Sequence, residues 1–132
     1  MNDSDFNSLV ESIKKKNSLL CIGIDPQDFE SEDIYNQLIN FGKRIINQTK
    51  EYAACFKPNI AFYEQYGIEG YKSLQKVIKR AKQFDIPVIL DAKRGDIGNT
   101  SKAYAKSIFE ELNVDAVTLS PYLGEDSLLP FF

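Results

Sequence analysis

Two acidic residues and a lysine stand close together between residues 91 and 96, and side chains of these types can move protons and repel anions. Asp91 and Lys93 are two positions apart, so on a β-strand they share one face and lie roughly 6.6 Å apart along the chain. Asp96 follows after a short turn, and we expect Lys93 to lie between the two carboxylates. Lys57 ends an earlier apolar segment and can reach the same face. The pattern predicts a catalytic array of alternating charges.

Such an array could donate a proton and oppose an anionic group of a substrate. Neighbouring carboxylates favour the charged form of Lys93, which could then act as a fixed proton donor. A carboxylate beside the pocket would favour loss of the anionic group, and the lysine would stabilise negative charge developing on carbon. We expect no metal and no cofactor. The alternative is a salt-bridge network, but charges at the mouth of parallel strands are costly unless they are used.

The elements that must position these residues alternate along the chain. Apolar residues at 6, 9, 10 and 13 share the spacing of one helical face and predict a first helix there. The continuous apolar run over 19–24 is typical of a strand covered on both faces. Further strands are predicted over 52–60, 87–93 and 115–120, and further helices over about 31–46, 68–84 and 97–112. An N-terminal helix followed by this strict alternation predicts an α/β fold with parallel strands.

Two architectures fit that order, namely an open doubly wound sheet and the first half of a TIM (β/α)8 barrel. Polar residues at the carboxyl ends of the strands favour the barrel, where active sites occupy that face. They are Asp25, Lys57, Asn59, Asp91, Lys93 and Ser120. No glycine-rich nucleotide-binding motif follows a strand, which disfavours the open sheet. We expect residues 1–132 to be a single, truncated barrel domain, because a barrel normally needs about 250 residues.

Composition argues against several classes of partner and location. The formal net charge is −3 with 27% charged residues, which does not suggest a surface for nucleic acid or for an anionic membrane. No apolar run approaches the roughly 18 residues of a membrane span, and the first residues do not look like a signal peptide. We expect a cytoplasmic protein whose two cysteines, Cys21 and Cys55, are buried thiols.

Four blocks make the chain similar to the orotidine 5′-phosphate decarboxylase family, in its longer bacterial-type branch. They are LCIGIDP at 20–26, FKPNIAFYE at 56–64, DAKRGDIGNTS at 91–101 and SPYLG at 120–124. The blocks follow the order and spacing of the family, and DAKRGDIGNT is highly specific. The resemblance implies loss of CO₂ from orotidine 5′-phosphate to give UMP, in de novo pyrimidine biosynthesis, without metal or cofactor.

The resemblance also implies roles for individual residues. Lys93 would give the proton to C6, and Asp91 would press against the leaving CO₂. Asp25 and Lys57 would contact the ribose hydroxyl groups, and Lys57 would join the charge network. Asp96 and Thr100 match positions that reach into the site of a neighbouring subunit, so a homodimer with shared active sites is implied. The other candidates for substrate binding are Asn59, Ile97, Ser120 and Pro121.

Three further expectations concern the activity of the chain alone and two alternative functions. In this family the phosphate is held after the seventh and eighth strands, so we expect the chain by itself to be inactive. A magnesium-dependent sugar-phosphate decarboxylase of a related barrel is an alternative, but Lys57-Pro58-Asn59 stands where that enzyme needs an acidic residue. A non-catalytic half-barrel that associates through the open edges of its first and fourth strands is the other alternative.

Overall fold

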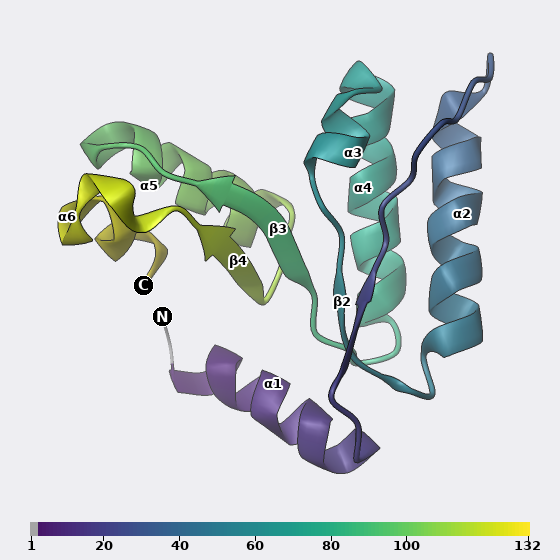
Figure 1. Ribbon diagram of the computed structural model, residues 1–132, viewed down its shortest axis with the longest axis horizontal. Helices are drawn as coiled ribbons and strands as arrows, with labels where there is room; N and C mark the ends of the chain where they lie inside the picture. The colour runs from purple at the N-terminus through teal and green to yellow at the C-terminus, as the bar shows by residue number, and fades with distance from the viewer. Residues whose placement is uncertain (1–2) are drawn as a thin grey trace.

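The computed structural model describes residues 3–132 as parallel strands with helices packed beside them (Figure 1). The main elements are α1 (Asp3–Lys16), β1 (Leu20–Gly23), α2 (Ile34–Thr49), β2 (Ala53–Lys57), α3 (Ala61–Glu64), α4 (Gly67–Lys82), β3 (Ile89–Arg94), α5 (Gly98–Lys106), β4 (Ala116–Leu119) and α6 (Glu125–Leu128). The predicted order of one helix, three strand–helix units and a fourth strand is confirmed. The short helix α3 was not predicted; it begins where Asn59 Oδ1 accepts a hydrogen bond from the Ala61 amide at 3.0 Å.

The four strands are parallel and follow one another in chain order. β1 pairs with β2, with Cys21 opposite Cys55 and Gly23 opposite Lys57. β3 pairs with β4, and two isolated parallel bridges, Phe56–Val88 and Asn59–Asp91, join β2 to β3. All four strands therefore end at the same edge.

The helices cover the strands on one side and bury a common core. In Figure 1, α4 lies behind β1 and β2, and α5 lies behind β3 and β4. The most deeply buried apolar side chains of this core include Phe56, Leu74, Ile78, Val88 and Leu90, each at most 1% exposed. Burial of such large side chains contributes about 1.5–3 kcal/mol each, which makes this layer the main source of stability.

Two contacts fix the outer helices. α2 packs beside α4 so closely that a Cβ atom at Gly42 would lie 2.5 Å from Cγ2 of Val77, and only glycine allows this approach. α1 packs against β2, where the Ser12 hydroxyl donates to the Ala54 carbonyl at 2.8 Å. Ala54 lies near the start of β2, so α1 is at the end of the strands opposite the charged residues. None of the helices described within residues 3–132 is long and apolar enough to cross a membrane.

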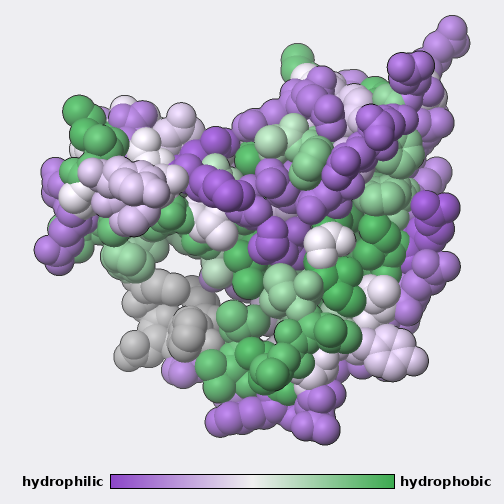
Figure 2. Space-filling view, in the orientation of Figure 1, coloured by the Kyte–Doolittle hydropathy of each residue, from purple (hydrophilic) through white to green (hydrophobic). Residues whose placement is uncertain are grey.

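Burial on β1 differs from the expectation of a strand covered on both faces. Leu19 and Leu20 are 85% and 56% exposed, and Cys21 is exposed while Cys55 is buried. The reason is that β1 pairs only with β2 in the part of the chain that the structure describes. Figure 2 shows hydrophobic surface over this region of the face. The expectation of two buried thiols is therefore wrong for Cys21.

The helix predicted over 97–112 is also not uniform. Regular α-helix ends at Lys106, and residues Ser107–Glu111 form a π-helical turn in which the Leu112 amide donates to the Ser107 carbonyl at 3.0 Å. Ile108 and Leu112 are both buried by this turn. The apolar spacing predicted the extent of the segment but not the change in its helical type.

Candidate active site

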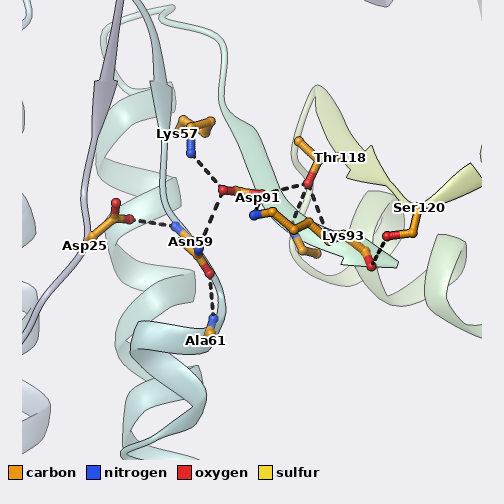
Figure 3. Close-up of polar contacts among 9 residues, drawn as sticks. Asp25, Lys57, Asn59, Ala61, Asp91, Lys93, Thr118 and Ser120 are labelled. Carbon is orange, nitrogen blue, oxygen red and sulfur yellow. Dashed lines mark hydrogen bonds and ion pairs between the residues drawn. The ribbon is translucent and has the colours of Figure 1, made fainter. Parts of the chain in front are cut away.

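The carboxylate of Asp91 is the centre of a cluster at the carboxyl ends of β2, β3 and β4 (Figure 3). Its Oδ2 atom accepts hydrogen bonds from Lys57 Nζ at 2.8 Å and from Asn59 Nδ2 at 3.5 Å. Its Oδ1 atom accepts from Lys93 Nζ at 2.6 Å and from Thr118 Oγ1 at 2.8 Å. Four donors fill the roughly four acceptor positions of an ionised carboxylate. The predicted contacts of Asp91 with Lys57 and Lys93 are both present.

These contacts keep the cluster charged. The pKa of Asp91 is held well below its usual range, first by the hydrogen bond from Lys57 and then by that from Lys93, against an opposing effect of burial. The pKa of Lys57 is raised, chiefly by the same bond to Asp91. The Asp91 side chain is only 10% exposed, whereas the Lys93 side chain is 63% exposed. At neutral pH the cluster is a shielded carboxylate with one ammonium group that remains open to a ligand.

A bulge in β3 gives Lys93 its position. The register between β3 and β4 shifts between Leu90 and Arg94, and the φ angle of Lys93 is 47°, in the left-handed region that lysine rarely adopts. The hydroxyl of Thr118 accepts hydrogen bonds from the amides of Ala92 and Lys93 at 3.1 and 3.0 Å. Lys93 thus shares a side of the strand with Asp91 through an irregular backbone rather than through regular alternation.

Thr118 was not among the residues predicted from the sequence. Its hydroxyl accepts hydrogen bonds from the two bulge amides and donates one to Asp91. These three bonds use the whole hydrogen-bonding capacity of the Thr118 hydroxyl. The available signal was its spacing, because Thr118 lies two positions before Ser120 and so shares a strand face with it. Ser120 itself donates from Oγ to the Lys93 carbonyl at 3.2 Å, which places it beside the bulge.

Asp25 and Asn59 connect the end of β1 to this cluster. Asp25 Oδ1 accepts a hydrogen bond from the Asn59 amide at 2.9 Å, and the Asn59 side chain contacts both Asp91 and the start of α3 (Figure 3). Asp25 therefore lies on the same edge as Lys57 and Asp91, as its position after a strand predicted. The structure brings Asp25, Lys57, Asn59, Asp91 and Lys93 together.

Asp96 does not join the cluster in the described chain, and this corrects the expected array. No ion pair links Lys93 to Asp96 among the described residues; Asp96 Oδ1 instead accepts from the Ile97 amide at 2.8 Å. The turn after β3 carries Asp96 away, so Lys93 contacts one carboxylate of its own chain. Ile97 is 63% exposed, and Thr100 and Pro121 are also exposed.

The arrangement suits charge-based chemistry at an open strand edge. Lys93 can present a proton, and Asp91 can place a permanent negative charge beside it. Within residues 3–132 no group of three or more His, Cys, Asp or Glu side chains is placed to hold a metal ion.

Comparison with known proteins places this cluster in a family. Residues 18–132 match the model of the orotidine 5′-phosphate decarboxylase / HUMPS family. Among curated relatives named orotidine 5′-phosphate decarboxylase, that of Flavobacterium johnsoniae is 48% identical and that of Christiangramia forsetii is 47% identical. Each match covers 93% of this chain and 47% of the relative. The chain thus spans about half the length of these relatives.

Comparison with solved structures agrees with this family match. The chain superposes on Leishmania donovani OMP decarboxylase with a TM-score of 0.87 and 49% identity, covering 96% of this chain and 48% of the other. For an orotidine-monophosphate-decarboxylase from Toxoplasma gondii the TM-score is 0.89 at 40% identity, covering 96% of this chain and 44% of the other. The expected fold, a parallel α/β part of a TIM barrel, is confirmed.

Proposed function

Because the chain belongs to the orotidine 5′-phosphate decarboxylase / HUMPS family, we propose that the full-length protein converts orotidine 5′-phosphate to UMP and CO₂ in pyrimidine biosynthesis. The observation that best supports this reaction is the hydrogen bond of 2.6 Å from Lys93 Nζ to Asp91 Oδ1, within the segment that carries the resemblance. The names of relatives at 47–48% identity support the same reaction. The protein works in the cytoplasm, where free thiols such as Cys21 and Cys55 stay reduced.

In the proposed reaction, the bond between C6 of the pyrimidine and its carboxylate breaks, and the electron pair stays on C6. Asp91 stays ionised because its pKa is depressed, so it repels the substrate carboxylate, and this repulsion is relieved as neutral CO₂ leaves. The Lys93 ammonium stabilises the developing charge and then gives its proton to C6. Lys57 holds Asp91 in place through the bond of 2.8 Å. No metal or cofactor takes part.

The same edge supplies candidate contacts to the substrate. Asp25 and Lys57 bind the ribose hydroxyl groups, and Asn59 links Asp25 to Asp91, since its amide donates to Asp25 and its side chain donates to Asp91. Ser120 and Pro121 line the mouth after β4. The phosphate is held by parts of the full-length protein beyond the matched half, so the chain alone is inactive; remote binding energy normally supports the chemistry.

A second subunit completes the site in this proposal. Asp96, Ile97 and Thr100 belong to the segment that carries the resemblance, yet among the described residues no hydrogen bond or ion pair joins them to Asp91 or Lys93 of their own chain. Large apolar side chains are exposed nearby, with Ile97 at 63% and Tyr122 at 92%. In this proposal these exposed apolar groups are covered by the second subunit, since large exposed apolar surfaces mark sites of protein interaction. Asp96 and Thr100 therefore reach into the site of the partner in a homodimer.

Turnover of orotidine 5′-phosphate by the full-length protein tests the reaction. Lys93→Ala should lower kcat by about 10²–10⁴-fold, the usual contribution of a positioned proton donor. Lys76→Ala, on the exposed side of α4, is the matched control and should keep full turnover. Unchanged turnover in Lys93→Ala would overturn the role of Lys93, and loss of activity in EDTA would favour the magnesium-dependent alternative.

Mixing two inactive variants tests the shared site. Lys93→Ala and Asp96→Ala full-length proteins should each be nearly inactive. After mixing and exchange of subunits, some dimers hold one site with both residues intact, so turnover should return. Failure to regain turnover, with mixed dimers demonstrated by mass spectrometry, would place Asp96 outside the partner's site.

A further inference from the structure

A groove of about 520 Å³ runs between α2 and α4, which lie side by side (Figure 1). Sites for small ligands have volumes of this order. Both walls of the groove belong to this chain, because the two helices follow the adjacent strands β1 and β2. The further strands of a complete barrel join beside β1 and β4, and the helices form an outer ring. Closure of the barrel therefore leaves this groove open to solvent.

The two helices are strongly basic, although the whole chain carries a formal net charge of −3. α2 contains Lys43 and Arg44 and no acidic residue. α4 contains five basic residues and one acidic residue, Glu69, which pairs with Lys72 at 2.9 Å. None of the side chains that line the groove is acidic. A hollow lined by charges of one sign concentrates ions of the opposite sign, so the groove attracts anions.

Four cations line the groove without a carboxylate partner. Lys43 comes from α2, whereas Lys76, Lys79 and Arg80 come from α4. Every ion pair found among residues 3–132 uses other lysines and arginines. Lys76 also lies three and four positions before Lys79 and Arg80, and like charges at these spacings destabilise a helix. An anion in the groove would relieve this repulsion.

Arg80 is held in one orientation at the wall of the groove. Its Nη2 atom donates to Asn47 Oδ1 at 2.7 Å, and its Nη1 atom donates to Gln83 Oε1 at 2.9 Å. Its guanidinium group stacks on Phe84, with Cζ 4.5 Å from the ring centroid. Each terminal nitrogen carries two N–H donors and keeps one of them for a ligand. A guanidinium group fixed in this way suits phosphate oxygens, because it loses little freedom on binding.

We propose that the groove between α2 and α4 binds a small anion with two or more linked phosphate groups. A single phosphate cannot contact cations spread over both helices, whereas a chain of phosphates can lie between Lys43 on one wall and Lys79 on the other. The source of this chemistry is a free oligophosphate or a nucleotide that carries one. Tyr35 and Asn40 also line the groove and offer a ring and an amide to a base. The site is separate from the cluster around Asp91.

Calorimetric titration of the full-length protein with inorganic triphosphate tests the proposal. The double variant Lys43→Gln/Lys79→Gln should lower the affinity by about tenfold or more, since each ammonium group makes charge-assisted hydrogen bonds to phosphate. Arg44→Gln is the matched control, because it removes one positive charge next to Lys43 but lies outside the groove lining. It should leave the affinity unchanged. Inorganic monophosphate should bind about tenfold more weakly than triphosphate.

Acetylation of lysines in the parent protein gives a readout that needs no variant. Saturating triphosphate should slow the acetylation of Lys43, Lys76 and Lys79, measured by peptide mass spectrometry. Lys106, which is exposed on α5, should react at the same rate with and without triphosphate. Protection of all four lysines to the same extent would show diffuse attraction of the anion to the surface, and would overturn the site.

A nucleoside triphosphate distinguishes the two sources of the phosphate chain. Equal affinity for the nucleotide and for inorganic triphosphate identifies the phosphate chain alone as the ligand. Affinity at least tenfold higher for the nucleotide, lost in Tyr35→Ala, identifies a nucleotide site. The proposal is overturned if triphosphate does not bind, if Lys43→Gln/Lys79→Gln binds it as tightly as the parent, or if Arg44→Gln weakens binding as much as the double variant does.

Discussion

Thr118 and Asp91 are joined across β4 and β3 by a hydrogen bond of 2.8 Å from Oγ1 to Oδ1. The same hydroxyl accepts from the amides of Ala92 and Lys93. One neutral side chain thus orients the central carboxylate and also holds the bulge that carries the lysine. The charged cluster depends on β4 as much as on β3.

Replacing Thr118 with valine should therefore destabilise the chain although the two side chains have nearly the same shape. The change leaves two amides of the bulge without their acceptor and removes one donor to Asp91. The expected loss in the free energy of unfolding is about 1–3 kcal/mol, measured by urea denaturation. Thr118→Ser keeps the hydroxyl and should retain most of the stability. Equal stability of the valine and serine variants would show that the hydroxyl is unimportant.

Acid should destabilise the chain partly through Asp91. Its pKa in the folded chain lies below the value of about 3.9 in an unfolded chain. The resulting stabilisation is fully present above about pH 3.9 and is lost as the pH falls through the lower folded pKa. Urea denaturation at a series of pH values between neutral and strongly acidic should show a shallower decline for Asp91→Asn than for the parent chain. Parallel curves would mean that Asp91 does not contribute to the acid response.

The two lysines should affect the pKa of Asp91 unequally. The bond from Lys57 is the largest cause of the depressed pKa, and the bond from Lys93 comes second. We expect the pKa of Asp91 to rise in both Lys57→Met and Lys93→Met, and to rise more in Lys57→Met. Carbon-13 NMR titration of the Asp91 carboxyl group measures this directly. The reverse order would mean that the exposed Lys93 binds the carboxylate more strongly than its partly buried neighbour.

The positions of the strands and of the main charges followed from the sequence. Continuous apolar runs predicted the strands, and polar residues directly after them predicted the edge at which Asp25, Lys57 and Asp91 meet. These predictions hold because the ends of parallel strands are fixed by the alternation of elements alone. The strand positions and the residues at the strand ends could be predicted without knowing which side chains are in contact.

What escaped prediction depended on contacts between distant segments. The role of Thr118 depends on a register shift of β4 against β3, and no local pattern around residue 118 indicates such a shift. Asp96 lies outside the cluster because of the path that the turn takes after β3. The exposure of Leu20 and Cys21 depends on how many partners β1 has, which an apolar run cannot reveal.

The approach of α2 to α4 gives a test of the packing that holds β1 and β2 in place. Gly42→Ala would improve helix propensity by about 1 kcal/mol at an open position. Here, however, the new Cβ atom would lie 2.5 Å from Cγ2 and 2.9 Å from Cγ1 of Val77. Such overpacking costs about 1–3 kcal/mol, so we expect a net loss of stability in urea denaturation.

A double-mutant cycle separates this clash from other effects of the substitution. Val77→Ala alone should destabilise the chain, because it removes buried methyl groups and leaves a cavity. In that background the two closest atoms, Cγ1 and Cγ2, are gone and only the Cβ atom of residue 77 stays close, at 3.3 Å. Adding Gly42→Ala should therefore cost much less than in the parent chain. The coupling energy between the two positions should therefore be large and favourable. If Gly42→Ala costs the same with valine or alanine at residue 77, the close approach of the helices is not what requires glycine.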